Sequence, residues 1–269
     1  MDPARPRAHL VFGPQGVARA DRMLPEEAAV ALSFNGTTQA VMMATPADLE
    51  DFAYGFALTE GIATAAEIER IDIEQAGQGL DVQTWLFPHA QSRLADRRRT
   101  MAGPVGCGLC GIDSVEQALR PVARVAPSAF RMTPDQVHQA AQGLRDRQPL
   151  HDLTHAAHCA ALWQPGGLTM VREDVGRHNA LDKLIGAATR PGAAPLGDFA
   201  VVLTCRVSVD MVQKAAAFGA PVIIAMSAPT AHAADLADEA GITLIAGLRG
   251  GQFHVYSHSD RLTEVAHVR

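Results

Sequence analysis

The feature that most constrains the fold is a regular alternation of helix-like segments and short apolar runs between residues 174 and 256. Helices are predicted over residues 174–185, 208–218 and 230–240, a buried strand over 199–204, and further strands over 222–226, 242–246 and 253–256. Such alternation through short links is typical of parallel βαβ units, in which helices cover the faces of the sheet. The pattern therefore predicts an α/β domain with a mostly parallel sheet over residues 126–269, with two further paired strands near 159–163 and 168–172.

Residues 1–125 have a different pattern, which predicts a smaller α+β region. The first 25 residues are rich in Pro and Arg and indicate a loose arm. Asn35-Gly36 separates two apolar runs and is a typical hairpin turn. Thr45-Pro46-Ala47-Asp48 predicts a helix that begins with Thr45 as its N-cap. Strands are predicted over 71–74 and 80–87, and further helix caps at Thr64 and Thr133.

Composition narrows the class of protein. The 269 residues carry a net charge of −6, which does not favour a surface for duplex nucleic acid. No apolar run is long enough to span a bilayer, and the N-terminus lacks the apolar region of a signal peptide. Four cysteines are too few for a disulfide framework in a chain of this length. We therefore expect a cytoplasmic protein that binds neither nucleic acid nor membrane.

The paired thiols of Gly106-Cys107-Gly108-Leu109-Cys110-Gly111 are the main chemical feature. Two cysteines at this spacing suit dithiol redox, half of a zinc site, or the carriage of a sulfur atom. A closed zinc site needs four ligands, but Cys159 and Cys205 are isolated in apolar stretches, where we expect buried and inert thiols. A zinc deaminase needs a His-x-Glu or Cys-x-Glu motif, which this chain lacks. A thioredoxin-like pair is expected directly after a first strand rather than in mid-chain.

Sulfur carriage requires an exposed cysteine that is largely ionised. Lowering a thiol pKa by two units takes roughly 2.7 kcal/mol, whereas a helix N-terminus supplies about 0.3–1 kcal/mol. The helix predicted to begin at Asp113 is therefore insufficient alone, and the run Arg97-Arg98-Arg99 is the candidate for the remainder. In this interpretation Cys110 releases the sulfur from Cys107 by forming a disulfide with it.

A second candidate site lies at the carboxyl ends of the predicted parallel strands, where α/β proteins bind ligands. These ends are Thr204-Cys205-Arg206, Ser227-Ala228-Pro229-Thr230 and Gly247-Leu248-Arg249-Gly250-Gly251-Gln252. Arg249 among glycines offers a guanidinium group and free backbone N–H groups to a phosphate. Arg172-Glu173-Asp174 and Arg177-His178-Asn179 gather polar groups at one strand-to-helix junction, which more often marks a site than a salt-bridged helix start.

The chain resembles the formate dehydrogenase accessory sulfurtransferases (FdhD/NarQ). The stretches that carry the resemblance are residues 45–52 with 58–61, the 106–111 loop, residues 172–183, and residues 207–217 with 227–230. The resemblance implies a sulfurtransferase that takes sulfur from a cysteine desulfurase and passes it to a bis-molybdopterin guanine dinucleotide molybdenum cofactor for formate dehydrogenase. It also implies a homodimer and a cytidine-deaminase-like, three-layer C-terminal domain.

The resemblance further assigns roles to single residues. Cys107 corresponds to the persulfide carrier, and Gly247, Leu248, Arg249, Gly250, Gly251 and Gln252 correspond to the segment that contacts the cofactor. No resident metal is expected. The chain departs from the family at residues 154–158, where glycines are expected after Thr154. A non-catalytic cofactor chaperone and a structural zinc protein remain the alternatives.

Overall fold

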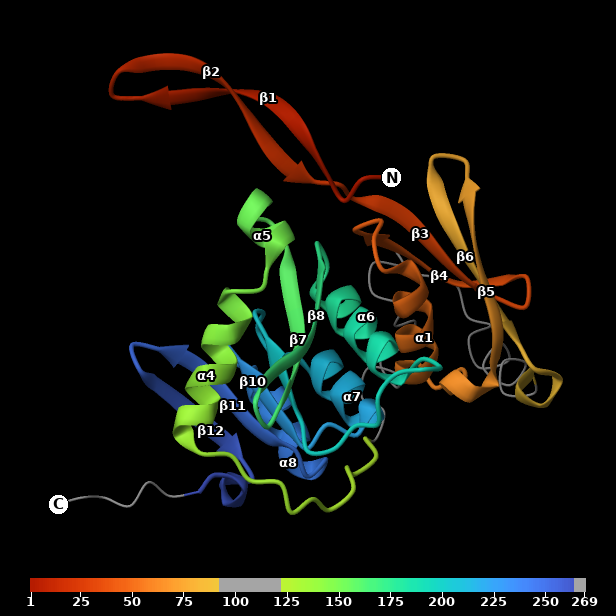
Figure 1. The fold of residues 1–269 in the computed structure, drawn as a ribbon, viewed down its shortest axis with the longest axis vertical. Coiled ribbons are helices and arrows are strands. Elements are labelled where there is room, and N and C mark those ends of the chain that lie inside the picture. The colour runs from red at the N-terminus through yellow and green to blue at the C-terminus, as the bar shows by residue number, and fades with distance from the viewer. Residues whose placement is uncertain (92–121, 264–269) are drawn as a thin grey trace.

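The computed structural model describes residues 1–91 and 122–263. A two-stranded ribbon, a four-stranded sheet and a six-stranded sheet follow one another along this part of the chain (Figure 1). The strands are β1 Ala4–Gly13, β2 Gly16–Pro25, β3 Ala28–Phe34, β4 Thr37–Ala44, β5 Ile68–Ala76, β6 Gly79–Leu86, β7 His158–Gln164, β8 Gly167–Asp174, β9 Ala200–Leu203, β10 Val222–Ala225, β11 Thr243–Arg249 and β12 Gln252–Ser257. The α-helices are α1 Leu49–Thr59, α4 Pro134–Arg145, α5 Pro149–Thr154, α6 Arg177–Thr189, α7 Val209–Phe218 and α8 Ala231–Glu239.

The six-stranded sheet has the order β12-β11-β10-β9-β7-β8 and is mixed. The prediction of a mostly parallel sheet is wrong, because only the β9–β10 and β10–β11 pairs are parallel, while β7–β8, β7–β9 and β11–β12 are antiparallel. Tight hairpins force the β7–β8 and β11–β12 pairs to reverse direction. The connection from β8 through α6 then passes over β7, so β9 lies antiparallel to β7.

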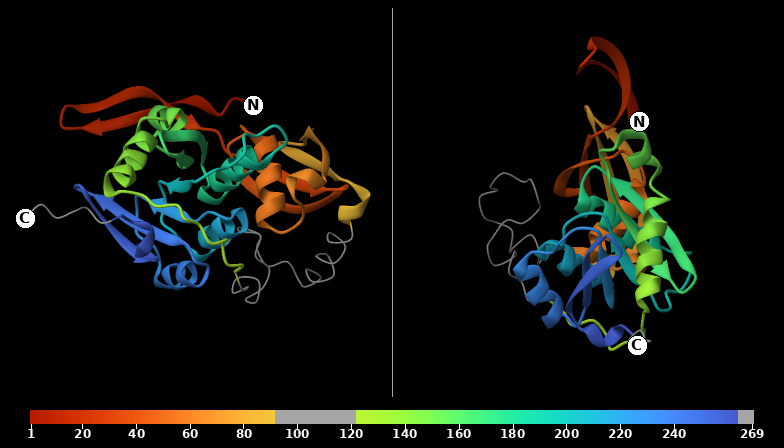
Figure 2. Two further views of the ribbon diagram at one scale, coloured as in Figure 1. Left: turned by 60° about the horizontal axis from the view of Figure 1, so that its bottom comes forward. Right: turned by 90° about the vertical axis from the view of Figure 1, so that its left-hand side faces the viewer.

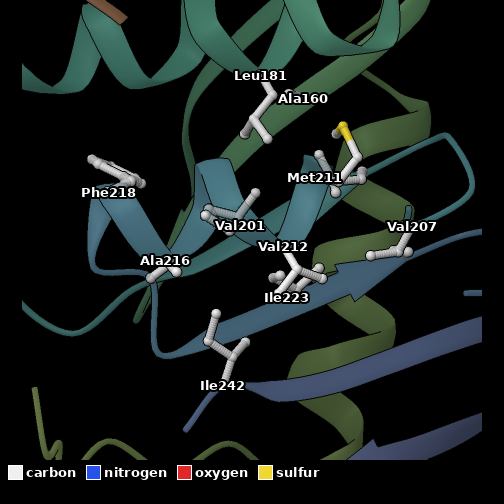
Figure 3. Packing of buried hydrophobic residues seen from close by; sticks show 14 of the residues in the cluster. Ala160, Leu181, Val201, Val207, Met211, Val212, Ala216, Phe218, Ile223 and Ile242 are labelled. Atoms are coloured by element: carbon white, nitrogen blue, oxygen red, sulfur yellow. The ribbon is translucent and has the colours of Figure 1, made fainter. Parts of the chain in front are cut away.

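Side chains of the central strands alternate between two cores, as the pleat of a sheet requires. Val201 and Leu203 pack with α6, α7 and α8, whereas Ala200 and Val202 pack with α4. Figure 3 shows the first of these cores, including Leu181 of α6 and Ile223 of β10. The predicted three-layer arrangement is therefore present, and both faces of the sheet are covered.

The first sheet has the order β4-β3-β6-β5 and carries α1 on its buried face. The hairpin at Asn35-Gly36 is confirmed, with φ angles of 46° and 73°. The predicted cap at Thr45 is wrong: α1 begins at Leu49, after Asp48 in a left-handed conformation. Thr45 instead accepts a hydrogen bond on its hydroxyl from the Val175 N–H, 3.1 Å away. A contact across the fold therefore overrides the local capping signal.

Helices α1 and α6 cross at two glycines and so join the two sheets. A Cβ on Gly55 would lie 1.7 Å from the Asp182 carbonyl oxygen, and one on Gly186 would lie 1.8 Å from that of Asp51. The backbones therefore touch, which only glycine permits. The boundary predicted at residues 125 and 126 stays a prediction.

Residues 4–25 form the β1–β2 ribbon, so the prediction of a loose arm is wrong. The ribbon extends from the body past α5, as Figure 2 shows from two sides. No helix within residues 1–91 and 122–263 combines the length and apolar character needed to cross a bilayer.

Candidate functional site

The predicted sulfur-carrying thiols Cys107 and Cys110 lie outside the described residues, as do Arg97-Arg98-Arg99 and the helix predicted at Asp113. Their assignment stays a prediction. The other two cysteines are described, and both are buried. Burial raises the pKa of the Cys159 thiol far above its usual range and raises the pKa of Cys205 to about 11. Both thiols are therefore protonated near pH 7, as expected of inert core cysteines.

The predicted strand ends do lie side by side. The Thr204 N–H donates to the Cys159 carbonyl at 3.1 Å, and the Gly247 N–H donates to the Ser227 carbonyl at 3.3 Å. Between them the Met226 N–H donates to the Leu203 carbonyl at 2.9 Å. These bonds run across the sheet, so the ends of β9, β10 and β11 form one continuous edge. We call it the carboxyl edge.

The turn from Gly247 to Gln252 stands at one end of this edge. Gly250 and Gly251 have φ angles of +60° and +76° and connect β11 to β12. Gly247 has φ +70° at a register shift in the same hairpin, where a Cβ would crowd His254 at 3.1 Å. Leu248 is buried in the core beneath, whereas Arg249 is exposed. Glycine is thus needed for the path of the chain itself.

A cavity of about 270 Å³ lies between this turn and α4. Five of the six predicted cofactor residues line it, and Gly247 does not; the lining is Leu248, Arg249, Gly250, Gly251 and Gln252 with His138, Ala141, Gln142 and Arg145 of α4. The guanidinium groups of Arg145 and Arg249 make this cavity suitable for an anionic group such as a phosphate. The contribution of α4 could not be read from the sequence.

A second cavity of about 480 Å³ lies further along the carboxyl edge, beside Thr204. We call it the histidine cavity; it is lined by Gln148, His151, His155, Ala156, Ala157, His158, Val175 and Thr204. The Gln148 side chain is only 6% exposed, yet within the described part of the chain its amide makes no hydrogen bond. An amide in the wall of a cavity is a group to which a ligand can hydrogen-bond.

The imidazoles of the histidine cavity are partly fixed. His151 donates from Nδ1 to the Ala157 carbonyl at 3.1 Å, and its ring packs edge-on against His155. Burial, together with the nearby Arg177 guanidinium, lowers the pKa of His158. His158 is therefore neutral near pH 7 and can accept a hydrogen bond. The sequence signal that was overlooked is the pair His151 and His155, which the end of α5 and its left-handed C-cap residue bring into contact.

The polar block at residues 172–183 has a largely structural task. Asp174 and Lys183 form a fully buried ion pair with an N–O distance of 2.6 Å. Asp174 also accepts hydrogen bonds from the Thr45 and Gly176 N–H groups and from the Asn179 amide. These contacts tie the end of β4 to the β8–α6 junction, which leaves none of these polar groups free for a ligand.

Three neighbouring ion pairs extend this network. Arg172 pairs with Asp51 of α1 at 2.7 Å. Lys214 of α7 pairs with Asp182 at 2.9 Å and with Glu60 at 3.1 Å. The chain has only two lysines, Lys183 and Lys214, and both are buried in these ion pairs. The four-stranded and six-stranded sheets, with their helices, are therefore held together by these ion pairs as well as by the contact of α1 with α6 at Gly55 and Gly186.

His178 lies beside this network. Burial, with help from Arg177, lowers the pKa of His178 to about 4. Its Nε2 atom lies 3.6 Å from a carboxylate oxygen of Asp210. The ring is neutral near pH 7, so it does not serve as a cationic acid there. Within residues 1–91 and 122–263, no cluster of three or more His, Cys, Asp or Glu side chains is arranged to hold a metal ion.

Fold and site together define a mixed α/β protein with polar cavities along the carboxyl edge of its central strands. The model of the FdhD/NarQ family matches residues 25–263. The chain is 51% identical over 248 residues to the sulfur carrier protein FdhD of Agrobacterium fabrum, covering 91% of each chain. It is 52% identical over 258 residues to that of Brucella abortus, covering 95% of this chain and 96% of the relative.

A solved structure agrees with these relatives. A crystal structure from Desulfotalea psychrophila, titled a formate dehydrogenase accessory protein, superposes with a TM-score of 0.76 at 27% identity. The match covers 97% of this chain and 99% of that one. The chain belongs to the FdhD/NarQ family.

Proposed function

We propose that the chain is a sulfur carrier in the maturation of formate dehydrogenase, and that it carries the sulfur as a persulfide on Cys107. The relatives named sulfur carriers, which share about half of its residues, support the role. The observation that carries the residue assignment is the burial of Cys159 and Cys205 with raised pKa values. Of the four cysteines, this leaves Cys107 and Cys110 for thiolate chemistry.

The proposed chemistry has two steps. The Cys107 thiolate attacks the outer sulfur of a persulfide on a cysteine desulfurase, so one S–S bond forms as another breaks and no net oxidation occurs. The Cys110 thiolate then attacks the inner sulfur of Cys107, and the outer sulfur leaves as sulfide with the electron pair of the broken bond. A Cys107–Cys110 disulfide remains, and a cellular dithiol must reduce it before the next cycle.

The proposed acceptor is the molybdenum cofactor, bis-molybdopterin guanine dinucleotide, bound as a substrate along the carboxyl edge. Arg145 and Arg249 suit its phosphates, and the free Gln148 amide suits the donor and acceptor edge of a guanine or pterin ring. In this proposal the cavity at the turn and the histidine cavity hold different parts of one large ligand. The chain acts in the cytoplasm as a homodimer.

Mass spectrometry after incubation with a cysteine desulfurase and cysteine tests the sulfur step. We expect one added sulfur on Cys110→Ala, less on wild type because Cys110 releases it as sulfide, and none on Cys107→Ala. Formate dehydrogenase activity in cells should be lost with Cys107→Ala. If Cys107→Ala still accepts sulfur and matures the enzyme, the persulfide assignment is refuted.

Titration with guanosine diphosphate tests the ligand part independently. Arg249→Ala and Gln148→Leu should each weaken binding about ten-fold, because each removes a polar contact worth roughly 1–2 kcal/mol. Arg131→Ala is the matched control, since Arg131 is exposed and pairs with Asp260. Nucleotide binding without covalent sulfur on any variant would favour the chaperone alternative, and about one zinc per chain would favour the zinc alternative.

A further inference from the structure

The β1–β2 ribbon has two chemically different faces. Directly opposed residues of antiparallel strands project to the same side, so the register of the ribbon sorts its side chains. The apolar face carries Pro6, Ala8, Leu10, Phe12, Val17 and Met23, with Arg19 and Asp21 as its charged residues. The basic face carries Arg5, Arg7, His9 and Arg22, with Val11, Ala18, Ala20 and Leu24. This is the period of two that defines an amphipathic strand pair.

The outer part of the apolar face lacks cover from the rest of the described chain, whereas Met23 at its inner end is half-buried. Leu10, Phe12 and Val17 are 54%, 76% and 58% exposed. On the basic face, Arg22 donates to the Thr154 carbonyl of α5 at 3.3 Å. A two-stranded ribbon is marginally stable in water by itself. An ordered ribbon with one bare apolar face therefore needs something to pack against.

We propose that the apolar face packs against the same face of a second copy of this chain. The twofold axis lies in the interface, across the strands, at the level of His9 and Ala20. This axis sets β2 over the partner's β2 in the opposite direction. Arg19 then faces the partner's Asp21, and Leu10 faces the partner's Ala8.

The residue pattern itself is the argument for a second copy. Arg19 and Asp21 have opposite charges and lie on either side of the axis. The twofold axis therefore makes two ion pairs, because Arg19 of each copy faces Asp21 of the other. Phe12 lies over the partner's Pro6, and Leu10 lies over the partner's Ala8. Each large side chain therefore meets a smaller one. Arg19 and Asp21 are both exposed, and no salt bridge within the described residues uses them. The face is thus complementary to itself in charge and in size.

This inference deepens the homodimer of the proposed function and is independent of its sulfur chemistry. The family model matches residues 25–263, so all of the ribbon except its last residue lies outside it. Loss of the dimer would therefore be read separately from loss of sulfur loading on Cys107.

Analytical ultracentrifugation of the full chain tests the inference. We expect wild type to be a dimer. Arg19→Asp and Asp21→Arg should each raise the dimer dissociation constant roughly ten- to hundred-fold, because two attractive pairs become repulsive. The double variant Arg19→Asp/Asp21→Arg should restore the wild-type constant, since the pairs are then exchanged. Phe12→Asp should give a monomer.

Val11→Asp is the matched control, because Val11 is 45% exposed on the basic face of the same ribbon. It should leave the dimer unchanged. The inference is overturned by a monomeric wild type, by a dimer that the single reversals leave intact, or by a double variant that does not recover. Dissociation by Val11→Asp to the same extent as by Phe12→Asp would also overturn it. Circular dichroism verifies that each variant is folded.

Discussion

Replacing Gly55 by Ala at the helix crossing should destabilise the protein strongly. The new Cβ would lie 1.7 Å from the Asp182 carbonyl oxygen and 2.9 Å from the Gly186 nitrogen. Both atoms are backbone, so no side chain can rotate away, and α1 and α6 must move apart. Overpacking of this kind costs about 1–3 kcal/mol and occasionally more.

Two further contributions adjust this figure. Moving α6 also disturbs the buried contacts of Asp182 with Thr59 and Lys214, at 2.8 and 2.9 Å. In the opposite direction, Ala favours a helix over Gly by about 1 kcal/mol. We expect a net loss of about 2–4 kcal/mol in the free energy of unfolding, a large part of the ~5–15 kcal/mol that domains have.

Gly143→Ala in α4 is the matched control. A Cβ there would lie 3.4 Å from two carbon atoms of Leu168, an ordinary contact. The same chemical change should therefore stabilise α4, by about 0.5–1 kcal/mol. Urea unfolding followed by circular dichroism measures both. Equal effects of the two substitutions, or a Gly55→Ala variant as stable as wild type, would refute the reasoning.

Two other substitutions test the buried charges. Lys183→Met leaves the Asp174 carboxylate buried without its countercharge, so it should cost about 3–5 kcal/mol in the same assay; a loss below about 1 kcal/mol would contradict a buried pair. His178 has a pKa of about 4 in the fold and about 6.5 when unfolded. The unfolded chain therefore binds a proton first, and wild type should lose about 3 kcal/mol between pH 6.5 and pH 4 relative to His178→Asn; parallel stability curves would contradict this.

The sequence predicts those elements whose signals are local. The capping box at Thr133 is present, and α4 runs from Pro134 to Arg145. The hairpin at Asn35-Gly36 forms because both residues tolerate positive φ. The strands of the second sheet follow from their apolar runs, but their directions do not. Only the path of α6 over β7 decides that β9 lies antiparallel to β7.

The ribbon and the cavities show what local signals miss. Pro6 and the arginines of the first 25 residues suggested a loose arm, although residues opposed across the hairpin form an apolar face. Gly250 and Gly251 were assigned to ligand binding, and in the structure their positive φ angles also make the turn between β11 and β12. Its cavity also needs Arg145, more than 100 positions earlier, which only the fold brings near. Gln148 has no sequence signal, since only the fold places it in the wall of the histidine cavity.

The polar block at residues 172–183 joins structure to site through one loop. Asp174 is held by Lys183 and Thr45 in the buried network, while the next residue, Val175, lines the histidine cavity. The Val175 N–H donates to Thr45, so its backbone position is set from the first sheet. The wall of the cavity is thus fixed by the contact between the two halves. The polar residues of this block were expected to bind a ligand directly. In the structure they affect the histidine cavity indirectly, because they fix the position of Val175, which lines it.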